Sequence, residues 1–114
     1  MKLTLHKPPP LNKLYGTNKW GGKYLKKDGV LWRSVALIMI RQQKLQNWDV
    51  PVYLKVDLYT CRHQDNDSIL KLLQDTLQEA GVFKDDFLIF DLRVIKHKSS
   101  IKEERVEIEV DILT

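Results

Sequence analysis

The sequence is poor in the features that identify a cofactor most directly. It has a single cysteine, Cys61, among 114 residues, which excludes an internal disulfide and is typical of a reducing compartment such as the cytoplasm. Its three histidines follow no zinc-ligand spacing. A glycine-rich phosphate loop is also missing, so the sequence gives no support for nucleotide-dependent chemistry.

Long apolar runs are missing as well. The longest, Val35 to Ile40, has six residues, whereas a membrane-spanning helix needs about 20. The N-terminus lacks the apolar segment of a signal peptide. With 43% hydrophobic and 30% charged residues, the composition predicts one soluble globular domain over residues 1–114, without a membrane partner.

Acidic residues are scarce in the first part of the chain. Residues 1–64 hold 12 lysines and arginines against 3 aspartates and glutamates, a net charge of +9, whereas residues 65–114 carry −5. The basic part predicts a polyanionic partner. Many of its lysines lie in residues 7–27 with aromatic residues between them, which suits phosphate contact and base stacking. The alternative is a solvated loop with aromatic residues packed on the sheet.

Hydrophobic periodicity predicts the element order β-α-β-α-β-β. Residues 1–6, 52–59 and 106–112 alternate as half-buried strands do, and residues 87–95 are apolar on both faces, as expected of a central strand. Apolar residues at helical spacing predict helices over residues 28–45 and 68–80. We therefore expect an α+β fold of two layers, with two helices on a four-stranded mixed sheet.

The first helix is expected to begin with Asp28 as its N-cap and to fade by Asn47. Residues 7–27 before it are expected to form a loop, and Gly81 to end the second helix in the C′ position. The predicted buried stripe of the first helix consists of Leu31, Val35, Ile38 and Leu45, widened by Leu37 and Ile40.

The segment Asp65-Asn66-Asp67 lies between a predicted strand and the second helix. In an extended segment, residues i and i+2 point the same way, so both carboxylates can share one Mg²⁺, which prefers oxygen ligands. A cation held there can activate water and stabilise charge on a phosphoryl oxygen. Lys71, one helical turn after Asp67, can offset charge in the transition state. Alternatively, Asp67 is only the N-cap and Lys71 makes a surface pair with Asp67 or Asp75; spacing alone favours this second interpretation.

Other carboxylates lie nearer the C-terminus. Asp85-Asp86 directly precedes the strand predicted over residues 87–95 and is typical of a turn. Asp91 interrupts that strand, and a half-buried carboxylate needs a partner. Arg93 is two residues on and on the same face, so it is the expected partner.

Taken together, these residues resemble the RusA family of Holliday junction resolvases. The resemblance rests on Asp65-x-Asp67-x-x-x-Lys71, on Asp85-Asp86, on Asp91-x-Arg93-Val94-Ile95-Lys96, and on a proline-rich loop from Pro8 to Tyr15 that contains Asn12. It covers most of the chain. Ser68 stands where the family often has asparagine, and residues 61–64 are less rich in arginine than in better-known members.

The resemblance implies a homodimeric, magnesium-dependent endonuclease that makes paired symmetric nicks across four-way DNA junctions in recombination and repair. Mn²⁺ is a possible substitute, and many relatives are encoded by phages or prophages. The resemblance assigns the metal ligands to Asp65, Asp67 and Asp86 and gives Lys71 a catalytic role. It also favours DNA contacts by Asn12, Lys13, Tyr15, Lys19, Lys23, Lys26, Lys27 and Arg62. Two alternatives stay open: a non-catalytic junction-binding dimer, and a metal-dependent nuclease of other branched DNA.

One geometric question follows from the predicted helix. It carries the chain about 20 Å from Asp67, at 1.5 Å per residue. Residues 81–86 can return about 20 Å at most when fully extended. A cluster of Asp67 and Asp86 therefore needs a shorter or tilted helix, or a dimer that brings the two carboxylates together from different chains.

Overall fold

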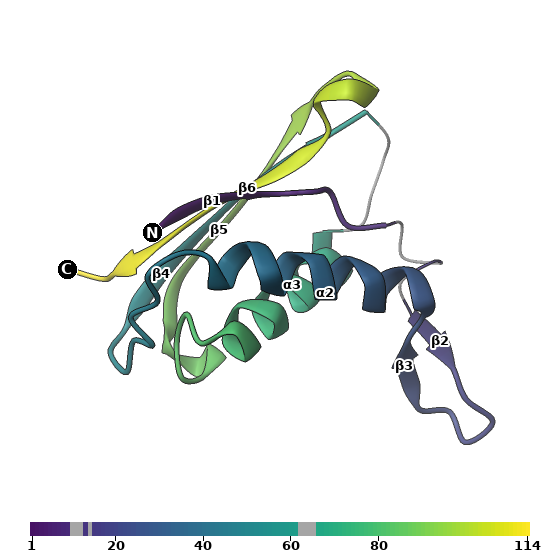
Figure 1. The fold of residues 1–114 in the computed structure, drawn as a ribbon, viewed down its shortest axis with the longest axis horizontal. Coiled ribbons are helices and arrows are strands. Elements are labelled where there is room, and N and C mark those ends of the chain that lie inside the picture. Colours follow the sequence, from purple (N-terminus) through teal and green to yellow (C-terminus); the bar gives the residue numbers. More distant parts are fainter. Residues whose placement is uncertain (10–12, 14, 62–65) are drawn as a thin grey trace.

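The computed structural model describes residues 1–9, 13, 15–61 and 66–114, with the backbone alone for residues 66–68. The strands of the main sheet are β1 (Lys2–Leu5), β4 (Val52–Thr60), β5 (Ile89–Lys98) and β6 (Arg105–Ile112). The sheet has the order β1-β6-β4-β5, in which only β4 and β5 are parallel. The helices α2 (Lys27–Arg41) and α3 (Asn66–Ala80) lie side by side against this sheet (Figure 1). The predicted two-layer α+β fold with a four-stranded mixed sheet is confirmed.

The core lies between the helices and one face of the sheet. Alternate residues of β4, from Val52 to Leu58, are almost fully buried, and the inward residues of β1 and β6 join them. Helix α3 closes the core with Leu72, Leu73 and Leu77. Each such side chain stabilises the fold by about 1.5–3 kcal/mol relative to an exposed position. The opposite face of the sheet carries charged and aromatic side chains.

The buried stripe predicted for α2 is confirmed at Ile40, and the predicted Leu37 packs against the core as a partly buried residue, but the prediction is wrong at three positions. The buried residues are Gly29, Trp32, Ala36 and Ile40, whereas the predicted Leu31, Val35 and Ile38 are 63%, 38% and 62% exposed. Both sets have helical spacing, so periodicity could not choose between them. The indole Nε1 of Trp32 donates to the carbonyl oxygen of His6 at 2.7 Å, which holds the Trp32 face against the segment after β1.

The ends of α2 also differ from the prediction. The N-cap is Lys26, which makes no side-chain capping bond, and Asp28 lies inside the first turn. Its carboxylate there still interacts favourably with the helix dipole. The helix ends at Arg41, so Leu45 packs on the core from the following segment rather than from the helix.

A small hairpin occupies part of the predicted loop over residues 7–27. Strands β2 (Tyr15–Thr17) and β3 (Lys23–Leu25) pair antiparallel and project from the body beyond the start of α2 (Figure 1). The Asn18 side-chain oxygen accepts from the amides of Trp20 and Gly22, at 2.9 Å each, and Gly21 adopts φ +81°. The strands are only three residues long, which is too short for a period that sequence reasoning detects.

Strand β5 is an edge strand and not the predicted central one, because β6 takes the position between β1 and β4. Its exposed apolar residues include Phe90 and Leu92, which are 65% and 41% exposed. The predicted pairing of Asp91 with Arg93 is confirmed at 3.5 Å. Gly81 ends α3 with φ +93°, also as predicted. No helix among the described residues is long and apolar enough to cross a membrane.

Candidate metal centre and nucleic-acid interface

The first group of candidate residues lies at the start of α3. Asp65 is outside the described residues, and Asp67 is described by its backbone alone, which falls in the first turn because α3 begins at Asn66. The buried face of the helix, from Ile69 to Leu77, fixes its rotation on the sheet. Lys71 is exposed, and within the described part of the chain it makes no ion pair, so the expected alternative of a pair with Asp75 is not observed.

Asp86 lies near the other end of α3. It begins the short 3₁₀-helix η1 (Asp86–Leu88), whose N-cap Asp85 accepts from the amide of Phe87 at 3.3 Å. The amide of Asp86 donates to the side-chain oxygen of Gln78 at 3.2 Å. Gln78 follows Asp67 by 11 residues, which is about 16 Å along a helix axis. The Asp86 backbone is therefore level with the last turns of α3, not with the first.

The charges around Asp86 favour a cation. A hydrogen bond shared with the Asp85 carboxyl raises the pKa of Asp86, and burial and the negative charges of Asp85 and Asp75 raise it further. Crowded carboxylates of this kind are relieved when a cation binds. An all-oxygen donor set fits Mg²⁺ or Mn²⁺ better than a soft metal.

The donor set near Asp86 is incomplete by itself. Among the residues that the structure describes, no three histidine, cysteine or acidic side chains converge as a full metal site. The two remaining candidate ligands, Asp65 and Asp67, have side chains outside that description. Asp86 and its neighbour Asp85 thus supply some of the carboxylates of a candidate metal centre, and Asp65 and Asp67 are the candidates for the rest.

The second group of candidates forms a basic surface at the hairpin. Lys13, Tyr24, Lys26, Lys27 and Asp28 line an open hollow of about 390 Å³. The ammonium groups outnumber the one carboxylate, so the hollow attracts anions.

Exposed aromatic rings accompany these lysines. Trp20 at the hairpin turn is 80% exposed, and Lys19 Nζ lies 4.5 Å from the centre of its ring. Tyr24 is 51% exposed and lies beside Lys23 on β3. Flat rings beside ammonium groups can stack on unpaired bases while the lysines contact phosphates.

Tyr15 has a different environment from the other hairpin candidates. It packs against the hydrophobic core, and burial, followed by the charge of Asp75, raises its pKa, while Arg33 opposes the shift. Tyr15 thus anchors the base of the hairpin between the two helices. Asn12 and Arg62, the remaining candidates, lie outside the described residues.

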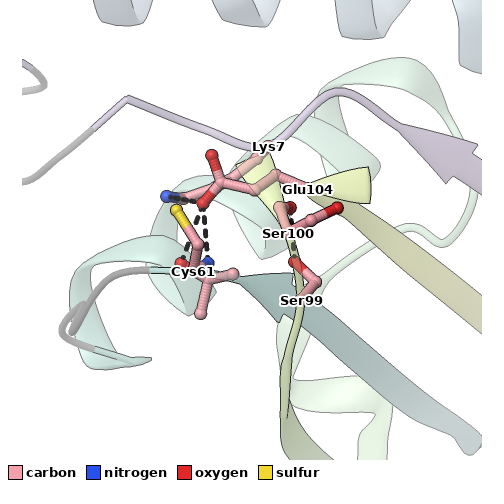
Figure 2. Close-up of polar contacts among 6 residues, drawn as sticks. Lys7, Cys61, Ser99, Ser100 and Glu104 are labelled. Atoms are coloured by element: carbon pink, nitrogen blue, oxygen red, sulfur yellow. Dashed lines mark hydrogen bonds and ion pairs between the residues drawn. The ribbon is translucent and has the colours of Figure 1, made fainter. Parts of the chain in front are cut away.

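Two residues near the site were missed by sequence reasoning. Gln78 gave no signal, because its bond to Asp86 depends on how η1 returns to α3. Glu104 did leave one: it continues the inward alternation of Val106, Ile108 and Val110, yet it is charged. A charged residue at an inward position needs a partner, and Figure 2 shows its partners at the end of the sheet.

The chain matches a model of the family described as Endodeoxyribonuclease RusA over residues 7–111. It is 33% identical over 100 residues to the crossover junction endodeoxyribonuclease RusA of Aquifex aeolicus (strain VF5), covering 84% of this chain and 79% of the relative. The identity to the protein of the same name from Escherichia coli O139:H28 is 31% over 98 residues, with 82% and 80% covered. The protein of Enterobacteria phage HK97 is 34% identical over 92 residues, with 78% and 76% covered.

Proposed function

The chain belongs to the RusA family of endodeoxyribonucleases, and on that premise we propose that it is a divalent-metal-dependent endonuclease that resolves four-way DNA junctions. The observation that carries the proposal is that one family match, over residues 7–111, contains both the basic hairpin and the candidate carboxylates. Activity on recombination and repair intermediates would take place in the cytoplasm, where the DNA of a bacterium or an infecting phage is found.

In this proposal the metal ligands are Asp65, Asp67 and Asp86. The crowding of Asp86 by the Asp85 and Asp75 carboxylates, which raises the pKa of Asp86, would be relieved by a bound cation. When bound, Mg²⁺ would activate water for in-line attack on the scissile phosphate and stabilise the charge that develops there, and Mn²⁺ could replace it. Lys71, exposed and without an ion pair among the described residues, can offset charge on the phosphate in the transition state.

The proposed enzyme is a homodimer in which each metal centre takes ligands from both chains. Support comes from α3, which is fifteen residues long and therefore not shortened at the end that carries Asp67. Asp86 lies level with Gln78 at the far end of that helix. A two-fold axis that brings the start of one α3 to η1 of the partner would assemble two equivalent centres, as paired nicks require.

The surface around Asp86 supports the same dimer. Phe87 and Phe90 are 69% and 65% exposed, and they follow Asp86 by one and four residues, on η1 and at the start of the edge strand β5. Exposed phenylalanines beside an uncovered sheet edge favour association with another chain. Burial of this patch against a second copy would join dimerisation to assembly of the metal centre.

The proposed DNA contacts are Asn12, Lys13, Tyr15, Lys19, Lys23, Lys26, Lys27 and Arg62. The exposed lysines of the hairpin would contact phosphates, and Trp20 and Tyr24 would stack on bases that are unpaired at the centre of a junction. Because Tyr15 is packed on the core, it would hold the hairpin in place for these contacts.

The test is single-turnover cleavage of a synthetic four-way junction, with and without Mg²⁺. Wild type is expected to make paired nicks only with the cation, and Asp67→Asn to bind the junction without cutting it. Asp49→Asn, an exposed aspartate paired with Lys84, is the matched control and should cut normally. Binding without cutting by wild type, under any divalent cation, would identify a non-catalytic junction-binding protein. Equal cutting of forks and flaps would identify a nuclease of branched DNA in general.

A further inference from the structure

The inward rows of the sheet end in a row of polar side chains. Leu5 pairs with Val106 and Leu58 also pairs with Val106, so β6 lies between β1 and β4 at this end. When the same registers are continued by two residues, Lys7 follows Leu5, Glu104 precedes Val106 and Thr60 follows Leu58. These three residues therefore lie opposite one another. Side chains two apart in a strand share a face, so all three point toward the helices.

One oxygen of Glu104 joins this row. Its Oε2 accepts from Lys7 Nζ at 2.8 Å, from the Thr60 hydroxyl at 3.2 Å and from the amide of Cys61 at 3.0 Å (Figure 2). The side chains of Lys7 and Glu104 are only 13% and 19% exposed. The Lys7 ammonium, followed by the Cys61 amide, lowers the pKa of Glu104 to about 2, so the carboxylate is charged at all physiological pH values.

Stability alone gives a poor explanation for this row. A mostly buried ion pair is often no more stabilising than apolar side chains of similar volume, because both charges lose their hydration. The alternation of all three strands calls for apolar residues at these positions, as it does at Leu5, Leu58 and Val106. Violations of a local pattern of this kind concentrate where function requires them.

The segments that Glu104 joins lead directly to the two parts of the proposed site. Lys7 precedes Pro8 and the basic segment, and the carbonyl of His6 just before it is held by Trp32. Cys61 is the last described residue of its segment, and Asp65 follows it by four positions in the sequence. Glu104 itself comes just before the central strand β6, between η2 (Ile101–Glu103) and Arg105.

We propose that Glu104 is a positioning residue, whose carboxylate fixes the chain that leads to the metal-binding aspartates relative to the chain that leads to the DNA-binding hairpin. The proposal rests on the function proposed above and gives Glu104 no contact with metal or DNA. Its loss should affect the cleavage step and the concentration of Mg²⁺ needed for half-maximal rate. Junction affinity should change little, because the hairpin is also anchored through Tyr15.

The test compares Glu104→Gln, which removes the charge but keeps an acceptor, with Glu104→Ala, which removes both. Glu109→Gln is the matched control, since Glu109 lies on β6, which begins directly after Glu104, and accepts from Tyr53 at 2.7 Å, but faces the open side of the sheet. Single-turnover cleavage should fall about 10- to 100-fold in the Glu104 variants, as expected for a misplacement of about 1 Å. Junction affinity, measured with Ca²⁺ in place of Mg²⁺, should stay within about threefold, a free-energy change under 1 kcal/mol.

A second readout does not depend on activity. Amide hydrogen exchange at Cys61 should be slow in wild type, faster in Glu104→Ala and intermediate in Glu104→Gln, because the acceptor is lost or weakened. The variant Lys7→Arg should keep near-normal cleavage. Lys7→Met should slow cleavage as much as Glu104→Gln does, and the double variant Lys7→Met with Glu104→Gln should cleave no more slowly than either single variant.

The outcomes separate the two proposals. Suppose that wild type cleaves, and that Glu104→Gln and Glu104→Ala cleave at the wild-type rate, need no more Mg²⁺ and show unchanged exchange at Cys61. This result would overturn the positioning role and leave the proposed function standing. A lower melting temperature with an unchanged rate well below that temperature would show a purely structural role and would also overturn it. If wild type does not cleave, the proposed function itself fails, and the exchange measurement alone then decides whether Glu104 orders Cys61.

Discussion

The amide of Asp86 donates to the side-chain oxygen of Gln78 at 3.2 Å, which holds Asp86 at the C-terminal part of α3. Asp67 lies in the first turn of the same helix. The helix rise between Asp67 and Gln78 is about 16 Å, whereas two oxygen ligands of one Mg²⁺, each about 2 Å from the metal, are at most about 4 Å apart. This relationship is the physical reason for proposing that the two aspartates act on one metal from different chains.

Mixing two inactive variants tests that arrangement. A heterodimer of Asp67→Asn with Asp86→Asn would keep one intact centre if Asp86 acts across the dimer, and none if it acts within its own chain. We therefore expect the mixed variants to regain a single nick per junction after subunit exchange, read on a denaturing gel. Each variant alone is the control and should remain inactive. Absence of nicking in a mixture shown to contain heterodimers would contradict the shared centre.

The apolar surface beside Asp86 predicts the dimer interface. Phe90→Asp should convert the dimer to monomer, because a carboxylate in a buried contact is costly, and cleavage should be lost with it. Sedimentation or light scattering gives the mass. Ile101→Asp, a control at another exposed apolar position, should leave the dimer intact. A Phe90→Asp protein that stays dimeric would move the interface elsewhere.

The lysines of the hairpin and of the start of α2 should contribute to junction affinity mainly through phosphate charge. Each of Lys23→Ala, Lys26→Ala and Lys27→Ala should weaken binding, and each lost phosphate contact should reduce the slope of log K against log salt concentration by about 1. Fluorescence anisotropy at several salt concentrations measures this slope. Lys44→Ala, an exposed lysine after α2, should leave it unchanged. If all four variants show the same salt slope as wild type, these lysines do not contact DNA, and the hairpin is excluded from the interface.

The two apolar stripes of α2 make unequal contributions to stability. Ile40 is fully buried and Ile38 is 62% exposed. Ile40→Ala should lower the free energy of unfolding by about 2–5 kcal/mol, whereas Ile38→Ala should change it by about 0.5 kcal/mol or less. Chemical denaturation measures both. If Ile38→Ala lowers the free energy of unfolding by clearly more than this, the exposed apolar face of α2 that carries Ile38 is covered in solution.

The pH dependence of stability should report on Glu104. The folded-state pKa of about 2 is below the usual value of 4.5, so its stabilising contribution is present above pH 4.5 and is lost as the pH falls through 2. Glu104→Gln should therefore be less stable than wild type at neutral pH, with the difference shrinking between pH 4.5 and 2. Urea unfolding over this range measures it. A constant difference between the variants would contradict the charged pair with Lys7.

The sequence by itself predicted the two helices and the four strands of the main sheet, and its motifs supplied the candidate residues of the site. The alternation in β4 and β6 was strong enough to fix their inward faces, because a half-buried strand has a period of two. Gly81 was predictable for a local reason, since a left-handed C′ position favours glycine. The metal and DNA residues stay predictions that the motif and the family support, because Asp65, Asn12 and Arg62 lie outside the described residues and the Asp67 side chain is not described.

Only the tertiary structure decided which of several compatible patterns is buried. Trp32 rather than Leu31 faces the core because its indole reaches the carbonyl of His6, a partner 26 residues away. Strand β5 is an edge because β6 pairs with β4, and no pattern within β5 contains that information. Lys7 and Glu104 lie 97 residues apart in the chain and meet only because β1 and β6 are neighbours. Periodicity describes one element at a time, whereas these contacts depend on the register between elements.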